Sequence, residues 1–233
     1  MTEIWQGFLK AIGLIFTLNP EVIEITGLSL AVSLSACLIS AIVSIPLGTI
    51  IHFNTFWGKR VLVSFIQTFF SLPTVLVGLL VFLFFSRGGI FGSLGLMFTP
   101  AIMIIGQAVL VTPLMVGLVI SALSGLDKGA RETAVALGAS PIQMSWLLLR
   151  EARYGVMTGV ILGFGRAISE VGLALMVGGN IRGYTRTLTT AISLGTNMGD
   201  IELSLALGII LLAIALVINL LLSCLQQREH VGN

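Results

Sequence analysis

Residues 132–141, Glu-Thr-Ala-Val-Ala-Leu-Gly-Ala-Ser-Pro, lie within a polar interruption, residues 124–153, of an otherwise apolar chain. Membrane proteins usually join their spans with short, featureless loops, whereas this interruption carries the start and stop signals of two helices. Asp127 lies near the start of the first helix, where a carboxylate meets the positive end of the helix dipole. Gly138 supplies a left-handed residue that ends this helix. We therefore expect two short helices that meet at a glycine corner and bind a partner outside the membrane.

The second helix of this corner has the clearer start. Ser140 suits the N-cap, Pro141 suits the first helical position, and Gln143 completes a capping box. Apolar side chains then recur at spacings of four and three, at Ile142, Trp146 and Leu149. This stripe predicts that the second helix packs under the spans and leaves the first helix facing solvent. On residue chemistry alone, a structured loop without a partner is an equally good interpretation.

Composition places the rest of the chain in a bilayer. Hydrophobic residues make up 56% of the 233 residues and charged residues 9%. The mean hydropathy is +1.08, far from the balance of soluble domains. The net charge of +2 includes no basic block of the kind that binds nucleic acid. We expect an all-α integral membrane protein that forms one transmembrane domain over residues 1–233 and contacts lipid.

The apolar stretches predict five membrane spans. A helix needs roughly 20 mostly apolar residues to cross a bilayer. The stretches that qualify lie at about 26–51, 61–85, 100–123, 154–177 and 201–225. Residues 3–18 are too short to cross, and their apolar side chains share one helical face, which favours a helix lying in the membrane interface. Pro73 and Pro113 fall near the middle of the second and third spans, where each removes a backbone donor and kinks the helix.

Basic residues in the loops indicate the orientation, because Lys and Arg are retained on the cytoplasmic side. The loops on one side carry Lys59, Arg60, Lys128, Arg131, Arg150, Arg153 and Arg228. The loops on the other side carry Lys10, Arg87, Arg182 and Arg186. This difference predicts an external N-terminus, a cytoplasmic C-terminus and a cytoplasmic location for residues 124–153.

Arg166 and Glu170 form a charged pair inside the fourth span. Arg166 lies about 18 Å along the helix from Tyr154, near the midplane. A charge there costs roughly 2.5–3.5 kcal/mol to insert, so such residues usually face the bundle interior or a water-filled path. A stripe of small residues that permits close helix contact lies within about 60° of the pair, at Gly155, Gly159, Gly163 and Ala167. Either the pair lines a translocation pathway, where Arg166 attracts an anion and Glu170 moderates the attraction, or it only orders the helix.

The loop between the last two spans carries two further candidate residues. Its sequence from Gly178 to Thr187 predicts a turn, followed by a short half-apolar helix through Leu188. Arg182 and Arg186 are candidates for contact with an external anion or a docked receptor. Exposed loop arginines are more often simply solvated or lipid-facing, so that interpretation stays open.

The segment Glu132-Thr-Ala, three residues, then Gly138 resembles the EAA signature of permease subunits of binding-protein-dependent ABC importers. In that family the corner is a coupling helix, which seats in a groove of the ATPase subunit and transmits its closure to the spans. The resemblance therefore implies that residues 124–153 form a coupling region. The implied ATPase contacts are Glu132, Thr133, Ala134, Gly138, Ala139 and Ser140.

Where the longer family pattern ends in Leu-Pro, this chain has Arg150-Glu151, followed by Ala152-Arg153. The sequence Arg-Glu-Ala-Arg resembles the tungstate branch of this family. Residues 165–172 and 176–181 are also similar to tungstate permeases, and more loosely to molybdate and sulfate permeases. The resemblance covers essentially the whole chain. It implies a type I ABC importer permease fold in the inner (plasma) membrane of a prokaryote. It also implies tungstate as the cargo, delivered by an extracytoplasmic binding protein, with molybdate or sulfate as alternatives.

Several chemical functions lack support in the sequence. The chain has no G-x-x-x-x-G-K-[ST] phosphate loop, so ATP hydrolysis by that mechanism must take place on a separate chain. His52 and His230 stand apart from any cluster with metal-ligand spacing. The serines in the spans lack a nearby histidine base. We expect neither a metal nor another cofactor, and a membrane-embedded enzyme is the least supported class.

The remaining function classes differ in their partners. An importer permease requires an ATP-binding ABC subunit and an external binding protein. Five spans are few to enclose a pathway, and the small-residue stripe permits close contact with a partner helix. We therefore also expect a two-fold homodimer with the pathway on its axis. The alternative is an ion-gradient-driven secondary transporter or channel that uses Arg166 and Glu170 as a charge relay. The capped corner favours the importer, because a self-sufficient carrier needs no docking site.

Overall fold

The computed structural model describes residues 5, 8–9, 12–14, 16–17 and 19–231. These residues form helices, with no strand among them, which confirms the predicted all-α class. The helices are α2 (Pro20–Phe53), α3 (Lys59–Thr68), α4 (Thr74–Phe85), α5 (Pro100–Ser124), α6 (Lys128–Ala136), α7 (Pro141–Glu151), α8 (Arg153–Ile168), α9 (Gly172–Gly178), α10 (Leu188–Met198) and α11 (Ile201–Val231). Two 3-10 turns complete the order, η1 (Phe69–Ser71) and η2 (Gly92–Leu94). Half of the residues of the interfacial helix predicted over 3–18 lie outside the described residues, so that prediction is not tested.

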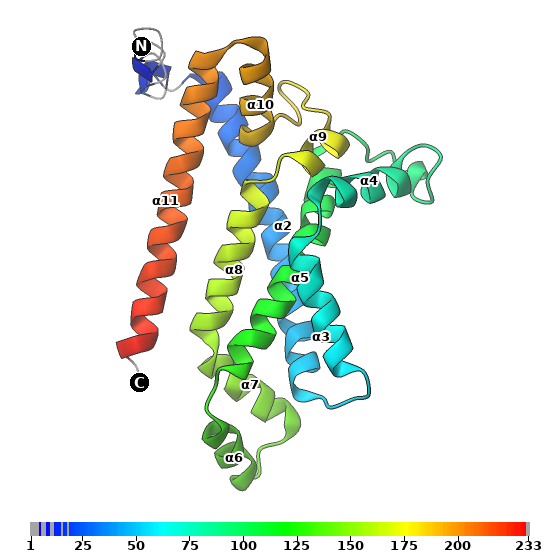
Figure 1. The fold of residues 1–233 in the computed structure, drawn as a ribbon, viewed down its shortest axis with the longest axis vertical. Coiled ribbons are helices and arrows are strands. Elements are labelled where there is room, and N and C mark those ends of the chain that lie inside the picture. Colours follow the sequence, from blue (N-terminus) through cyan, green and yellow to red (C-terminus); the bar gives the residue numbers. More distant parts are fainter. Residues whose placement is uncertain (1–4, 6–7, 10–11, 15, 18, 232–233) are drawn as a thin grey trace.

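The long helices define the shape of the molecule. Helices α2, α5, α8 and α11 run along its long axis, with α2, α5 and α8 in mutual contact and α11 against α8 (Figure 1). Helices α6 and α7 form one end of the molecule, here called the corner end (Figure 1). Helices α9 and α10 lie toward the opposite end, here called the loop end (Figure 1). The corner and the α9–α10 loop therefore face opposite directions.

Three of the expected spans are single helices, and two are bent. Helices α2, α5 and α11 are long and apolar enough to cross a membrane. The segment 59–71 meets α4 at 99°, with Pro73 immediately before α4, so the predicted kink is a complete break. Helix α8 meets α9 at 59°. The fourth span, expected as one continuous helix over 154–177, is therefore interrupted between Ile168 and Gly172.

Local caps explain where the long helices begin. Asn19 accepts a hydrogen bond from the Glu21 backbone N–H at 3.0 Å and so caps α2. Thr99 accepts one from the Ile102 backbone N–H at 3.5 Å and caps α5. Each cap satisfies an amide that the helix itself leaves unpaired.

Small and apolar residues pack the helices together. Ser40 and Ser44 of α2 donate hydrogen bonds to the Ala108 and Thr112 carbonyls of α5, each at 3.1 Å. Near the loop end, α9 contributes Leu173 to a buried cluster whose other members are Val32, Val77, Val81, Ile102, Met103, Leu110, Ala174 and Val177. Helix α9 is therefore part of the core, although it is only seven residues long.

The outer surface of the bundle is apolar. Ile42 on α2 is 72% exposed, and Leu212 on α11 is 69% exposed. Large apolar side chains in such numbers would be unfavourable in water, whereas lipid tails cover them without cost. The exposed helix faces are therefore suited to a bilayer.

Candidate functional site

Helices α6 and α7 meet at a tight turn that depends on Gly138. The φ angle of Gly138 is +76°, in the left-handed region that favours glycine. Its backbone N–H donates to the Val135 carbonyl at 3.0 Å, and the Ala139 N–H donates to the Ala134 carbonyl at 3.0 Å. These two bonds satisfy carbonyls at the end of α6, and they confirm the predicted glycine corner.

The start of α7 also agrees with the sequence. The Ser140 hydroxyl accepts the Gln143 backbone N–H at 3.4 Å, and the Gln143 side chain accepts the Ser140 N–H at 2.9 Å. This reciprocal pair is the predicted capping box. Asp127 lies at the N-cap of α6, where no side-chain hydrogen bond accompanies it.

The predicted ATPase-contact residues differ in exposure. Most of them are exposed, namely Glu132, Thr133, Gly138 and Ser140, while Ala139 is half-buried. Ala134 is only 2% exposed, so it packs within the corner and offers little surface to a partner.

The apolar stripe predicted on α7 packs against the bundle only at its last residue. Leu149 is partly buried and packs, with Leu148, in a cluster that includes Val119 and Val156. Ile142 is 83% exposed and Trp146 is 64% exposed, so the prediction that these two side chains pack under the spans is wrong. Four strongly exposed apolar side chains of α6, α7 and the turn between them are here called the corner surface: Val135, Leu137, Ile142 and Trp146. Sequence reasoning missed this surface because periodicity gives the stripe but not its direction.

The charged pair of the fourth span lies at the break between α8 and α9. Arg166 Nη1 is 3.3 Å from Glu170 Oε2, and the side chains are 36% and 2% exposed. Glu170 Oε1 accepts the Leu173 backbone N–H at 2.9 Å, at the start of α9. Glu170 therefore ties the end of α8 to the beginning of α9, where the helix dipole favours a carboxylate. Arg166 keeps part of its surface open.

The small-residue stripe on α8 is covered by α5 of the same chain. A Cβ atom at Gly159 would lie 3.0 Å from the Leu118 Cβ, and one at Gly163 would lie 3.0 Å from Val111 Cγ1. The close packing predicted for this stripe is confirmed. The expectation that it would pack against a second copy is wrong, because an intramolecular neighbour already occupies it.

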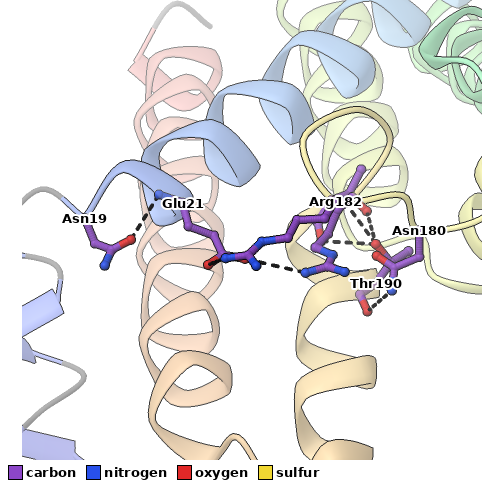
Figure 2. Close-up of polar contacts among 7 residues, drawn as sticks. Asn19, Glu21, Asn180, Arg182 and Thr190 are labelled. Atoms are coloured by element: carbon purple, nitrogen blue, oxygen red, sulfur yellow. Dashed lines mark hydrogen bonds and ion pairs between the residues drawn. The ribbon is translucent and has the colours of Figure 1, made fainter.

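The two loop arginines bind the first turn of α2. Arg182 Nη2 lies 2.7 Å from Glu21 Oε2 (Figure 2), and Arg186 Nη1 lies 3.5 Å from Glu21 Oε1. Arg182 is 71% exposed, whereas Arg186 is 17% exposed. The side chains come from segments more than 160 residues apart in the chain. The Arg182 side chain is therefore largely accessible, whereas that of Arg186 is mostly buried beside Glu21.

Residues 44–230 match the protein family described as binding-protein-dependent transport system inner membrane component. A probable anion ABC transporter permease protein of Haloferax volcanii is 43% identical over 216 residues, which are 91% of this chain and 93% of that protein. The tungstate uptake system permease protein TupB of Peptoclostridium acidaminophilum is 40% identical over 228 residues, 98% of this chain and 100% of that protein.

A solved structure shares the fold. The crystal structure of an amino acid ABC transporter with histidines superimposes with a TM-score of 0.68 and covers 92% of this chain and 96% of that chain. The sequences are 14% identical, so the likeness concerns the fold alone. The predicted permease fold is confirmed.

Proposed function

The chain belongs to the family of inner membrane components of binding-protein-dependent transport systems, and from this membership we propose that it is the permease subunit of an ATP-driven oxyanion importer, with tungstate as the cargo. An ATP-binding ABC subunit and an external binding protein are its partners. The chain itself is not an enzyme, and it needs no cofactor.

The observation that carries the proposal is the corner formed by α6 and α7. Exposed apolar side chains of the corner surface lie beside the polar residues Glu132, Thr133 and Ser140. A mixture of this kind suits a protein–protein interface. An ion-gradient-driven carrier needs no such surface, so that alternative is not favoured.

Packing contacts and a short backbone connection join the corner to the spans. Leu148 of α7 packs with Val119 of α5 and with Val156 of α8. The Ala152 backbone N–H donates to the Leu148 carbonyl at 2.8 Å, so α7 leads into α8 with one residue between them. Closure of the ATPase moves the corner, and α5 and α8 move with it. The corner faces the cytoplasm, as does the C-terminus, in agreement with the distribution of Lys and Arg.

Arg166 is the pathway residue of the proposal. Its guanidinium is partly exposed and already pairs with the buried Glu170 carboxylate. This partner lowers the attraction of the site for an anion, which allows an oxyanion to pass rather than remain bound. Because Glu170 is buried, its role is to position Arg166 at the edge of the pathway.

Tungstate is proposed as the cargo on the basis of the relatives. The TupB protein of Peptoclostridium acidaminophilum matches this chain over essentially its full length. The TupB protein of Campylobacter jejuni is 34% identical over 96% of this chain. Sulfate and molybdate permeases match at 31% identity or less, so these oxyanions are the alternative cargoes.

A second copy completes the pathway. The described residues offer at most five candidate spans, and only 17% of the apolar window of α11 is buried against the rest of the chain. A two-fold homodimer places Arg166 of both copies near a common axis. On the external side, Arg182 contacts the binding protein or the arriving anion. The assembly lies in the inner membrane of a prokaryote.

The experiment that tests this function uses the complex. The chain is purified with its ATP-binding subunit and its binding protein, and ATP hydrolysis is measured with tungstate, molybdate or sulfate. We expect tungstate to stimulate hydrolysis at the lowest concentration. No stimulation by any of the three would refute the oxyanion assignment.

A further inference from the structure

A buried cluster of threonines spans the end of the α9–α10 loop and the first turn of α10. Its members are Thr185, Thr187, Thr189 and Thr190, each less than 9% exposed. The Thr187 hydroxyl oxygen lies 3.4 Å from that of Thr189 and 3.1 Å from that of Thr190. Buried hydroxyls in an apolar protein are tolerated when hydrogen bonds satisfy them. The threonine hydroxyls therefore form specific hydrogen bonds that connect the α9–α10 loop with α9 and α10.

Two of these threonines hold α9 from both ends. The Thr185 hydroxyl donates to the Gly178 carbonyl, the last residue of α9, at 2.6 Å. The Thr189 hydroxyl donates to the Glu170 carbonyl, just before α9, at 2.6 Å. Because Thr189 lies in the first turn of α10, this bond joins α10 directly to the break in the fourth span.

The same segment is fixed to α2. The Leu188 backbone N–H donates to the Ser29 hydroxyl at 2.7 Å. Glu21 binds both loop arginines, and the Asn180 side chain donates to the Thr190 carbonyl at 3.3 Å (Figure 2). We call residues 20–29 and 172–198 together the loop-end unit. Side-chain bonds at several points join the segments of this unit to one another.

Glu170 lies on the border between this unit and α8. Its carboxylate contacts Arg166 on the α8 side and the Leu173 N–H on the α9 side. The chain bends by 59° here, and residues 169–171 are not helical. A non-helical segment between two packed helices can absorb a change of angle, as hinges do. The bond from Thr189 fixes the position of this segment relative to α10.

We propose that Thr189 is a positioning residue of the transport cycle: it holds Glu170, and through Glu170 the guanidinium of Arg166, in register with the loop-end unit. This inference rests on the proposed importer function. A binding protein that docks on the external face displaces α10, and the Thr189 hydroxyl passes this displacement to Arg166. Docking thereby changes the position of the Arg166 guanidinium in the pathway before the ATPase closes.

The test compares variants of Thr189 in the complete complex of permease, ATPase and binding protein. Thr189→Val keeps the shape and removes the donor, while Thr189→Ser keeps the donor. The readout is the ratio of ATP hydrolysis with loaded binding protein to hydrolysis without it. We expect Thr189→Val to lower this ratio about fivefold, the factor that corresponds to about 1 kcal/mol for one hydrogen bond. Thr189→Ser should keep the wild-type ratio.

Thr196→Val is the matched control. Thr196 lies on the same helix, and its exposed hydroxyl bonds only locally to the Ile192 carbonyl at 2.8 Å. Its ratio should equal that of the wild type. A wild-type ratio for Thr189→Val, or a loss in Thr189→Ser equal to that in Thr189→Val, would overturn the inference. Wild-type complex that shows no stimulation at all would instead count against the proposed function.

Hydrogen exchange on the wild-type complex gives a second test that does not depend on a variant folding. Docking of loaded binding protein should alter exchange in residues 188–191 and in residues 169–173 together. The Leu173 amide, bound by the Glu170 carboxylate, is the most informative position. A change in α10 that leaves residues 169–173 unchanged would contradict the inference, whether or not Thr189→Val assembles.

Discussion

Substitution of Gly138 should disturb the corner through its backbone alone. The φ angle there is +76°, and a Cβ atom added at this position meets no atom within 4 Å. The left-handed conformation costs an ordinary L-residue roughly 1–2 kcal/mol, with Asn less affected. Gly138→Val should therefore shift the balance from the formed to the unformed corner by about 5- to 30-fold. Gly138→Pro is more severe, because it fixes φ near −65° and removes the N–H that binds the Val135 carbonyl.

The assay measures binding of the ATP-binding subunit and stimulated ATP hydrolysis in lipid nanodiscs. If the ATP-binding subunit binds only the formed corner, its affinity for Gly138→Val should be lower by up to about 5- to 30-fold. Gly138→Asn should bind nearly normally, and Gly138→Pro should reside in the membrane without coupling. Gly125→Ala is the control in the same polar segment, since φ is −79° and the new Cβ lies 3.6 Å from the nearest atom.

Two results would refute this reasoning. Unchanged stimulation in Gly138→Pro would show that the corner does not transmit closure of the ATPase. Equal losses in Gly138→Asn and Gly138→Val would show that the left-handed backbone is not the cause.

Three further changes test other parts of the structure. Arg166→Gln should abolish oxyanion uptake and stimulated hydrolysis while the complex still assembles, and normal activity in both assays would exclude the assigned role. Ser140→Ala removes the acceptor of the Gln143 amide and should lower the free energy of unfolding by about 1 kcal/mol, measured by denaturant titration; an unchanged value would contradict the cap. Gly163→Leu places a side chain against α5 and should reduce the yield of monodisperse protein in size-exclusion chromatography. Gly165→Ala, with no atom within 4 Å of the new Cβ, should not reduce it, and equal losses in the two variants would argue against close packing.

The corner was predictable because its signals are local. Ser140, Pro141 and Gln143 specify the start of α7 through bonds that span three residues. Gly138 ends α6 through its own φ angle. Both features depend on neighbours in the chain, and the structure confirms both. The orientation of the stripe at Ile142 and Trp146 depends on where the bundle lies, which periodicity cannot specify.

The parts that sequence reasoning missed depend on distant contacts. The break in the fourth span contains no proline, and Thr189 stabilises it from 19 residues away. Glu21 binds Arg182 across 161 residues, so its role had no signal in the loop sequence. The small-residue stripe was correctly predicted to pack closely, but only the fold identifies α5 as its neighbour.

The most direct test of the central claim is tungstate uptake by proteoliposomes that contain the permease and its ATP-binding subunit. ATP is supplied on the side of the α6–α7 corner and loaded binding protein on the opposite side. We predict that uptake requires both and continues after all ion gradients are collapsed. Uptake by the permease alone, driven by an imposed ion gradient without ATP, would contradict the account.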